Sequence, residues 1–72
     1  MNRFGAVTSK RLVAALKRLA FYQIHQRGSH LQLKRGNLQV TVPMHAGDLS
    51  PGVLRSILRQ AHLKPEQVKE VL

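Results

Sequence analysis

The sequence HLQLKRGNLQVTV at residues 30–42 alternates apolar and polar residues on both sides of Gly36-Asn37. Such alternation is typical of strands with one buried face, and glycine followed by asparagine is a signal for a two-residue hairpin turn. We therefore predict two antiparallel strands, at residues 30–35 and 38–42. Pro43 lacks the amide proton that a strand ladder needs, so we expect the second strand to end there.

The two faces of this hairpin differ in character. Successive side chains of a strand point to opposite faces, so burial of Leu31 and Leu33 requires His30, Gln32 and Lys34 to stand on the other side. We therefore expect His30 to be exposed and not to be a core histidine.

A third strand is expected just before the hairpin. Residues 21–26, FYQIHQ, are rich in the aromatic and β-branched types that favour strands, and Gly28-Ser29 supplies turn chemistry after them. The three strands then form an antiparallel meander with one apolar and one polar face.

Amphipathic helices are predicted on both sides of the meander. Thr8 or Ser9 is the candidate N-cap of the first helix, and Ser50-Pro51 gives a cap and an N-terminal proline for the second. Apolar residues recur at helical spacing in each: Leu12, Val13, Leu16 and Leu19 in the first, and Val53, Leu54, Ile57, Leu58 and Ala61 in the second. A short third helix is expected from Lys64-Pro65-Glu66 onward.

The order helix, three strands, helix and short C-terminal helix predicts an α+β two-layer sandwich, with the helices on the apolar side of the antiparallel sheet. Residues 1–72 are too few for two cores, so we expect one domain, with residues 1–7 loose. The sequence has no apolar run of the roughly 20 residues that a membrane span needs and no signal peptide. We therefore expect a soluble, cytoplasmic protein with no membrane partner.

The chain carries 12 Lys and Arg residues against three Asp and Glu residues, a formal net charge of +9. Such a charge attracts polyanions, so nucleic acid or an acidic protein is the expected partner. Charge alone does not choose between RNA, DNA, an anionic membrane and an acidic inhibitor. The 43% of hydrophobic residues argues against a disordered basic tail.

The candidate site is the turn Arg27-Gly28-Ser29-His30. An imidazole at the start of a strand and among cations is suited to chemistry on a phosphodiester, with a solvated surface histidine as the alternative. We take His30 as the candidate catalytic residue. The candidates for RNA contact are Arg27, Ser29, Lys34 and Arg35.

The other histidines are weaker candidates. His45 is a possible second proton carrier, with a loop or capping role as the alternative, and His25 and His62 are expected to be structural or solvated. The histidines and the three carboxylates show no metal-ligand spacing, so we expect no metal site and no cofactor.

The chain resembles the HicA toxins of bacterial toxin–antitoxin pairs from about residue 9 to residue 72. The resemblance rests on the first helix running into Phe21, the turn at residues 27–30, VTVPMH at residues 40–45 and GVLRSILRQA at residues 52–61. It implies a fold like that of the double-stranded RNA-binding domain. It also implies a metal-independent endoribonuclease that cleaves messenger RNA through His30, does not bind DNA by itself and is inhibited by a HicB antitoxin.

The sequence departs from the family at several positions. The family usually carries Gly where Ala20 stands, often has a second His or an aromatic residue where Leu31 and Leu33 lie, and tends to show Gly where His62-Leu63 stands. Because Gly suits a left-handed helix end, we expect strain at the end of the first helix.

Three other functions stay open from the sequence. The main alternative is a non-catalytic module that binds double-stranded RNA by shape. A DNA-binding helix-turn-helix over residues 50–72 would leave the meander without a role, and a purely structural interaction protein would leave the charge unexplained.

Overall fold

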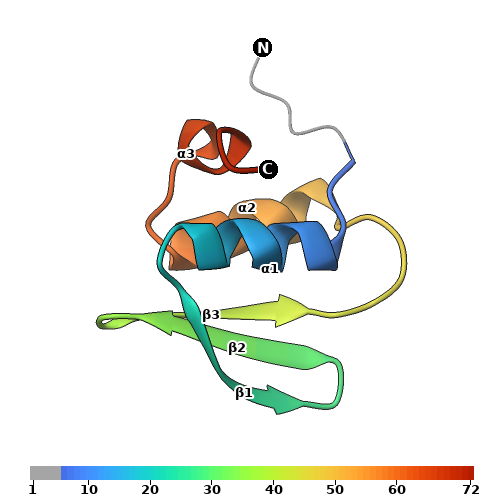
Figure 1. Ribbon diagram of the computed structural model, residues 1–72. Helices are drawn as coiled ribbons and strands as arrows, with labels where there is room; N and C mark the ends of the chain where they lie inside the picture. The colour runs from blue at the N-terminus through green and yellow to red at the C-terminus, as the bar shows by residue number, and fades with distance from the viewer. Residues whose placement is uncertain (1–5) are drawn as a thin grey trace.

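The computed structural model describes residues 6–72 and places a layer of helices over one face of an antiparallel sheet (Figure 1). The elements in chain order are α1 (Ser9–Arg18), β1 (Tyr22–Arg27), β2 (His30–Arg35), β3 (Leu38–Pro43), α2 (Pro51–Gln60) and α3 (Pro65–Lys69). This order confirms the predicted α+β fold.

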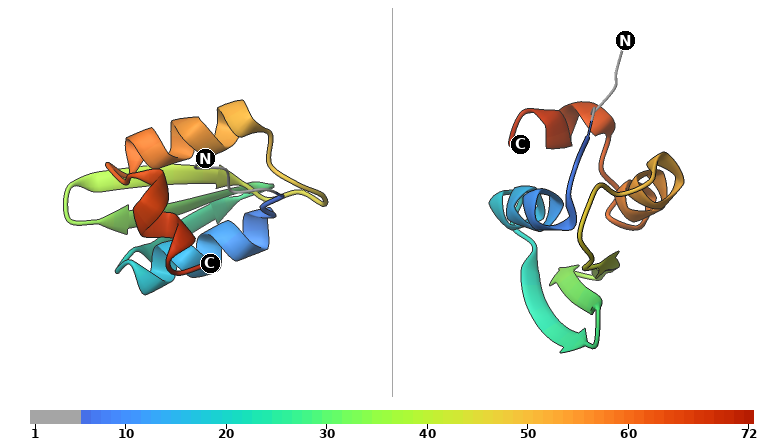
Figure 2. Two further views of the ribbon diagram at one scale, coloured as in Figure 1. Left: turned by 90° about the horizontal axis from the view of Figure 1, so that it is seen from above. Right: turned by 90° about the vertical axis from the view of Figure 1, so that its right-hand side faces the viewer.

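The sheet is a three-stranded meander in the order β1-β2-β3. Helices α1 and α2 lie side by side on one face of it, and α3 lies on the side of these helices that is remote from the sheet (Figures 1 and 2). No helix covers the opposite face of the sheet in the described part of the chain.

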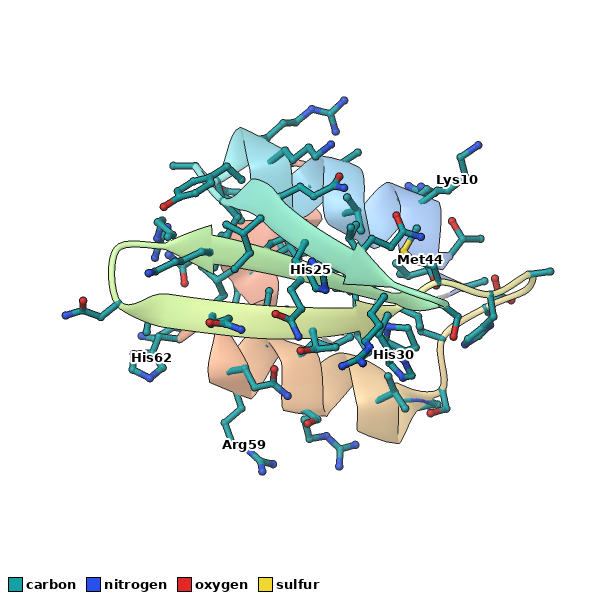
Figure 3. All side chains as sticks on the ribbon, turned by 90° about the horizontal axis from the view of Figure 1, so that it is seen from below. Lys10, His25, His30, Met44, Arg59 and His62 are labelled. Carbon is teal, nitrogen blue, oxygen red and sulfur yellow. The ribbon has the colours of Figure 1, made fainter. Side chains whose placement is uncertain are left out.

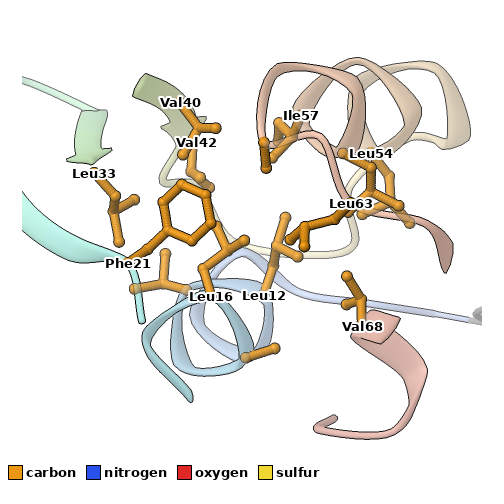
Figure 4. Packing of buried hydrophobic residues seen from close by; sticks show 14 of the residues in the cluster. Leu12, Leu16, Phe21, Leu33, Val40, Val42, Leu54, Ile57, Leu63 and Val68 are labelled. Carbon is orange, nitrogen blue, oxygen red and sulfur yellow. The ribbon is translucent and has the colours of Figure 1, made fainter. Parts of the chain in front are cut away.

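The core lies between the helices and the sheet, as Figure 4 shows. Leu31 and Leu33 of β2 and Val40 and Val42 of β3 are buried, whereas His30 is exposed. The predicted alternation is thus confirmed in β2 and β3. The buried stripe of α2 holds Leu54, Ile57, Leu58 and Ala61.

Val53 was expected in this stripe, but its side chain is 37% exposed. Each residue of a helix turns by about 100°, so Val53 lies at the edge of the stripe that begins at Leu54. The prediction that Val53 belongs to the buried stripe is therefore wrong.

The chain before α1 is held in place from Val7 onward. Val7 is 1% exposed, and its carbonyl accepts a hydrogen bond of 2.8 Å from the amide of Leu49. The expectation that residues 1–7 are loose is therefore wrong for Val7, whose apolar side chain completes the core, while residues 1–5 lie outside the described residues. Thr8 is the N-cap of α1, since its hydroxyl accepts from the amide of Arg11 at 3.2 Å.

Both long helices end in a Schellman motif around a non-glycine residue. Ala20 has φ +75°, and the amide of Phe21 donates to the carbonyl of Leu16 at 3.0 Å. At the end of α2, His62 has φ +55°, and the amide of Leu63 donates to the carbonyl of Leu58 at 3.0 Å. The expected strain at Ala20 is confirmed, because a side chain in the left-handed region meets a steric penalty of roughly 1–2 kcal/mol.

Ala20→Gly should therefore stabilise the protein by about 1 kcal/mol, since glycine adopts this φ without strain. The matched control is Ala14→Gly in the same helix, which should destabilise by about 1 kcal/mol because Ala14 lies in the helix interior. Urea denaturation measures both changes. A lower free energy of unfolding in Ala20→Gly would contradict the strain that we infer at Ala20.

The described residues contain no helix that is both long and apolar enough to span a membrane.

Candidate functional site

His30 is the first residue of β2 and pairs with a residue on each side, Arg27 of β1 and Pro43 of β3. The turn between Arg27 and His30 contains only Gly28 and Ser29. Gly28 has φ +57°, and a positive φ at the first central residue alone is the pattern of a type II′ turn. The turn thus sets the guanidinium-bearing residue directly opposite the imidazole-bearing one.

The backbone around His30 is tied to the rest of the protein. The carbonyl of Ser29 accepts from the amide of Met44 at 2.5 Å, and the carbonyl of Pro43 accepts from the hydroxyl of Ser9 at 2.6 Å. Ser9 is 1% exposed, so this bond anchors the end of β3 to the start of α1. These two bonds tie the backbone beside His30 to the loop after β3 and to α1, which supports a pre-organised position for the imidazole.

We call the sheet surface remote from the helices the open face. Cross-strand partners share a face, so the register defines its members. They are Tyr22, His25 and Arg27 of β1, His30, Gln32 and Lys34 of β2, and Gln39, Thr41 and Pro43 of β3. Figure 3 looks onto this face and shows the side chains of His25 and His30 on it.

The open face is basic. Arg27 is exposed and Lys34 is half-buried, and the three acidic residues Asp48, Glu66 and Glu70 all lie outside the strands. Between the cations, Gln39 donates a side-chain hydrogen bond of 2.9 Å to Gln32. This arrangement offers positive charge and amide groups to an anionic ligand.

Arg35 does not belong to this face. It follows Leu33 by two residues, so it points toward the helices, where its guanidinium donates to the carbonyl of Leu19 at 2.9 Å and lies 4.9 Å from the centroid of the Phe21 ring. These contacts cap the last turn of α1 and stack a cation on an aromatic ring. The structure thus places Arg35, unlike Arg27 and Lys34, on the helix side of the sheet.

His45 lies in the loop after β3, two residues beyond Pro43. Its exposed ring is hydrogen-bonded through Nδ1 to the carbonyl of Ala46 at 2.9 Å. Since a carbonyl only accepts, Nδ1 carries the proton and Nε2 is the nitrogen left for another partner.

His62 lies far from the candidate site. Figure 3 places it at the opposite end of the sheet from His30. Its role in the structure is to occupy the left-handed position that ends α2.

His25 is the residue that reasoning from the sequence missed. The register passes from Gln23 opposite Leu33 to His25 opposite Gln32, so Ile24 is an extra residue in a β-bulge. In a regular strand Tyr22 and His25 would face opposite sides, but the bulge puts both on the open face. No local sequence signal marks this bulge.

A family model described as the HicA toxin of bacterial toxin–antitoxin matches residues 9–63 of the chain. No individual curated protein matches the sequence. The matched segment runs from the start of α1 to Leu63, three residues beyond the end of α2, and includes Gly28 and His30. Because this segment covers most of its length, the chain belongs to the HicA toxin family of bacterial toxin–antitoxin systems.

Proposed function

We propose that this HicA toxin is an endoribonuclease that cleaves messenger RNA through His30 without a metal ion, and that an antitoxin of the HicB type inhibits it. The observation that carries the proposal is the exposed imidazole of His30 on the open face, directly opposite Arg27.

RNA supplies its own nucleophile, the 2′-hydroxyl. When the 2′-oxygen attacks phosphorus, its proton goes to a base, the bond to the 5′-oxygen breaks and that oxygen gains a proton from an acid. The products are a 2′,3′-cyclic phosphate and a 5′-hydroxyl, so no co-reactant is consumed. Imidazole suits either proton transfer near neutral pH, and His30 takes one of them.

The cations near His30 have a separate task. The phosphate gains negative charge in the transition state, and a guanidinium can form two parallel hydrogen bonds to its oxygens. We assign this contact to Arg27, which pairs with His30. Lys34, further along the same face, and Ser29, in the turn, then hold the neighbouring backbone of the RNA strand.

The net charge supports an acidic inhibitor. At +9, the toxin attracts a partner with negative charge, and complementary charge speeds association and selects the right partner. A HicB antitoxin that presents carboxylates to the open face would compete with RNA for the same cations.

Expression of this chain with and without a HicB-type antitoxin tests the proposal. We expect growth arrest and degraded messenger RNA when the toxin is produced alone, and intact messenger RNA with normal growth when both proteins are produced. Intact RNA in cells that contain folded toxin alone would refute the ribonuclease activity. Degradation that persists with the antitoxin would refute the inhibition.

Cleavage by the purified toxin should be unchanged by an excess of a chelator such as EDTA. The expectation rests on the donor set, since no group of three or more His, Cys, Asp or Glu residues within residues 6–72 is placed to hold a metal ion. The initial rate of cleavage of an RNA oligonucleotide measures it, with and without chelator. A rate that falls with chelator and returns with Mg²⁺ would reverse the metal-independent mechanism.

A further inference from the structure

We propose that His25 is a second catalytic residue, which transfers one of the two protons of RNA cleavage while His30 transfers the other. The inference rests on the proposed ribonuclease activity and extends it to a residue that the sequence pattern does not single out.

The first observation is the bulge at Ile24. It shifts the phase of β1 by one residue, so that His25 pairs with Gln32 and Arg27 pairs with His30 on the same face. Bulges commonly redirect a side chain next to an active site. Here the redirected side chain is an imidazole.

The second observation is the strand register, which sets the spacing between His25 and His30. His25 lies opposite Gln32, and His30 precedes Gln32 by two residues, so His25 and His30 are diagonal neighbours. The backbone positions of such neighbours are about 7–8 Å apart, within reach of long or aromatic side chains. Figure 3 shows both imidazoles on the uncovered side of the sheet, and both residues are exposed.

This spacing fits the chemistry of the reaction. In an in-line displacement the attacking 2′-oxygen and the leaving 5′-oxygen stand on opposite sides of phosphorus, so one imidazole cannot contact both at once. Two imidazoles that flank one phosphate can do so. A neutral ring takes the proton of the 2′-hydroxyl, and a protonated ring gives a proton to the 5′-oxygen.

Arg27 completes the arrangement. It stands two residues from His25 on the same strand and directly opposite His30, so the three side chains surround one point of the open face. A phosphate bound there contacts the guanidinium, which compensates the charge that develops during attack.

His45 is the less suitable second group. It belongs to a loop beyond the end of β3, whereas His25 and His30 both lie in paired strands of the sheet. The other titratable or charged members of the open face are Tyr22, Arg27 and Lys34, while β3 contributes only uncharged residues to it and no helix covers it.

The test compares kcat, KM and the pH profile of cleavage of an RNA oligonucleotide by the wild type and five variants, one of which is His30→Ala. We expect His25→Ala and His25→Arg to lower kcat by about 100-fold or more, to leave KM within a few-fold and to remove one limb of a bell-shaped pH profile. His45→Ala should retain most of the activity. The matched control is His62→Asn, which exchanges a distant histidine for a residue that tolerates the left-handed conformation and should behave as wild type.

The outcomes separate the two proposals. A His25→Ala variant with the kcat of the wild type and both limbs of the pH profile would overturn the role of His25. Wild-type activity in His25→Arg would overturn it as well, because an arginine replaces a phosphate-binding cation but not a proton carrier. Either result with an inactive His30→Ala variant leaves the proposed function standing. A folded wild-type toxin that cleaves no RNA would overturn both.

Discussion

Replacing His30 with alanine is expected to lower RNA cleavage by at least about 100-fold and to abolish growth inhibition. The imidazole is the group that we assign to proton transfer, and alanine leaves nothing in its place. Because the side chain is exposed, the free energy of unfolding should change by less than about 0.5 kcal/mol. Cleavage of labelled RNA and urea denaturation of the purified variant measure the two effects.

Two further variants sharpen this test. His30→Gln keeps a polar side chain of similar reach but exchanges no proton near neutral pH, and should be as inactive as His30→Ala. His62→Asn, at the opposite end of the sheet, should remain active. Wild-type cleavage by either His30 variant would end the assignment.

Leu33→Ala is expected to destabilise the protein by about 2–5 kcal/mol, the largest stability effect of a single substitution that we predict. Leu33 is fully buried in the central strand and belongs to the core between sheet and helices (Figure 4). The smaller side chain leaves a cavity that a core of this size fills poorly. Chemical denaturation at fixed temperature gives the change in the free energy of unfolding.

The matched control for this substitution is its neighbour on the other face. Gln32 pairs with Thr41 across the open face, and Gln32→Ala removes only a side-chain contact with Gln39. The change in its free energy of unfolding should stay within about 0.5 kcal/mol. Equal decreases in the free energy of unfolding for Leu33→Ala and Gln32→Ala would contradict a sheet with one buried and one open face.

The sequence predicts most of the fold because its signals are local. The hairpin of β2 and β3 follows from alternation and from glycine at a two-residue turn, and the strands begin and end within a residue of their predicted positions. The same alternation predicts that His30 is exposed. It also turns Arg35 toward the helices, where its guanidinium donates to the carbonyl of Leu19.

The parts that could not be predicted depend on contacts between distant segments. The bulge at Ile24 changes which face carries His25, and it arises from pairing with β2 and not from a local motif. Val7 is held by a backbone hydrogen bond to Leu49, 42 residues further along the chain. Neither contact leaves a periodic pattern in the sequence.

The proposal that RNA meets His30 on the open face can be tested by an NMR titration of the labelled toxin with an RNA oligonucleotide whose 2′-hydroxyls are methylated, so that they cannot attack phosphorus. We expect the largest shifts on His25, Arg27, His30 and Lys34, while Arg55 and Arg59, which are exposed on α2, stay unchanged. Shifts confined to the helices, with the resonances of His30 unmoved at saturation, would contradict it.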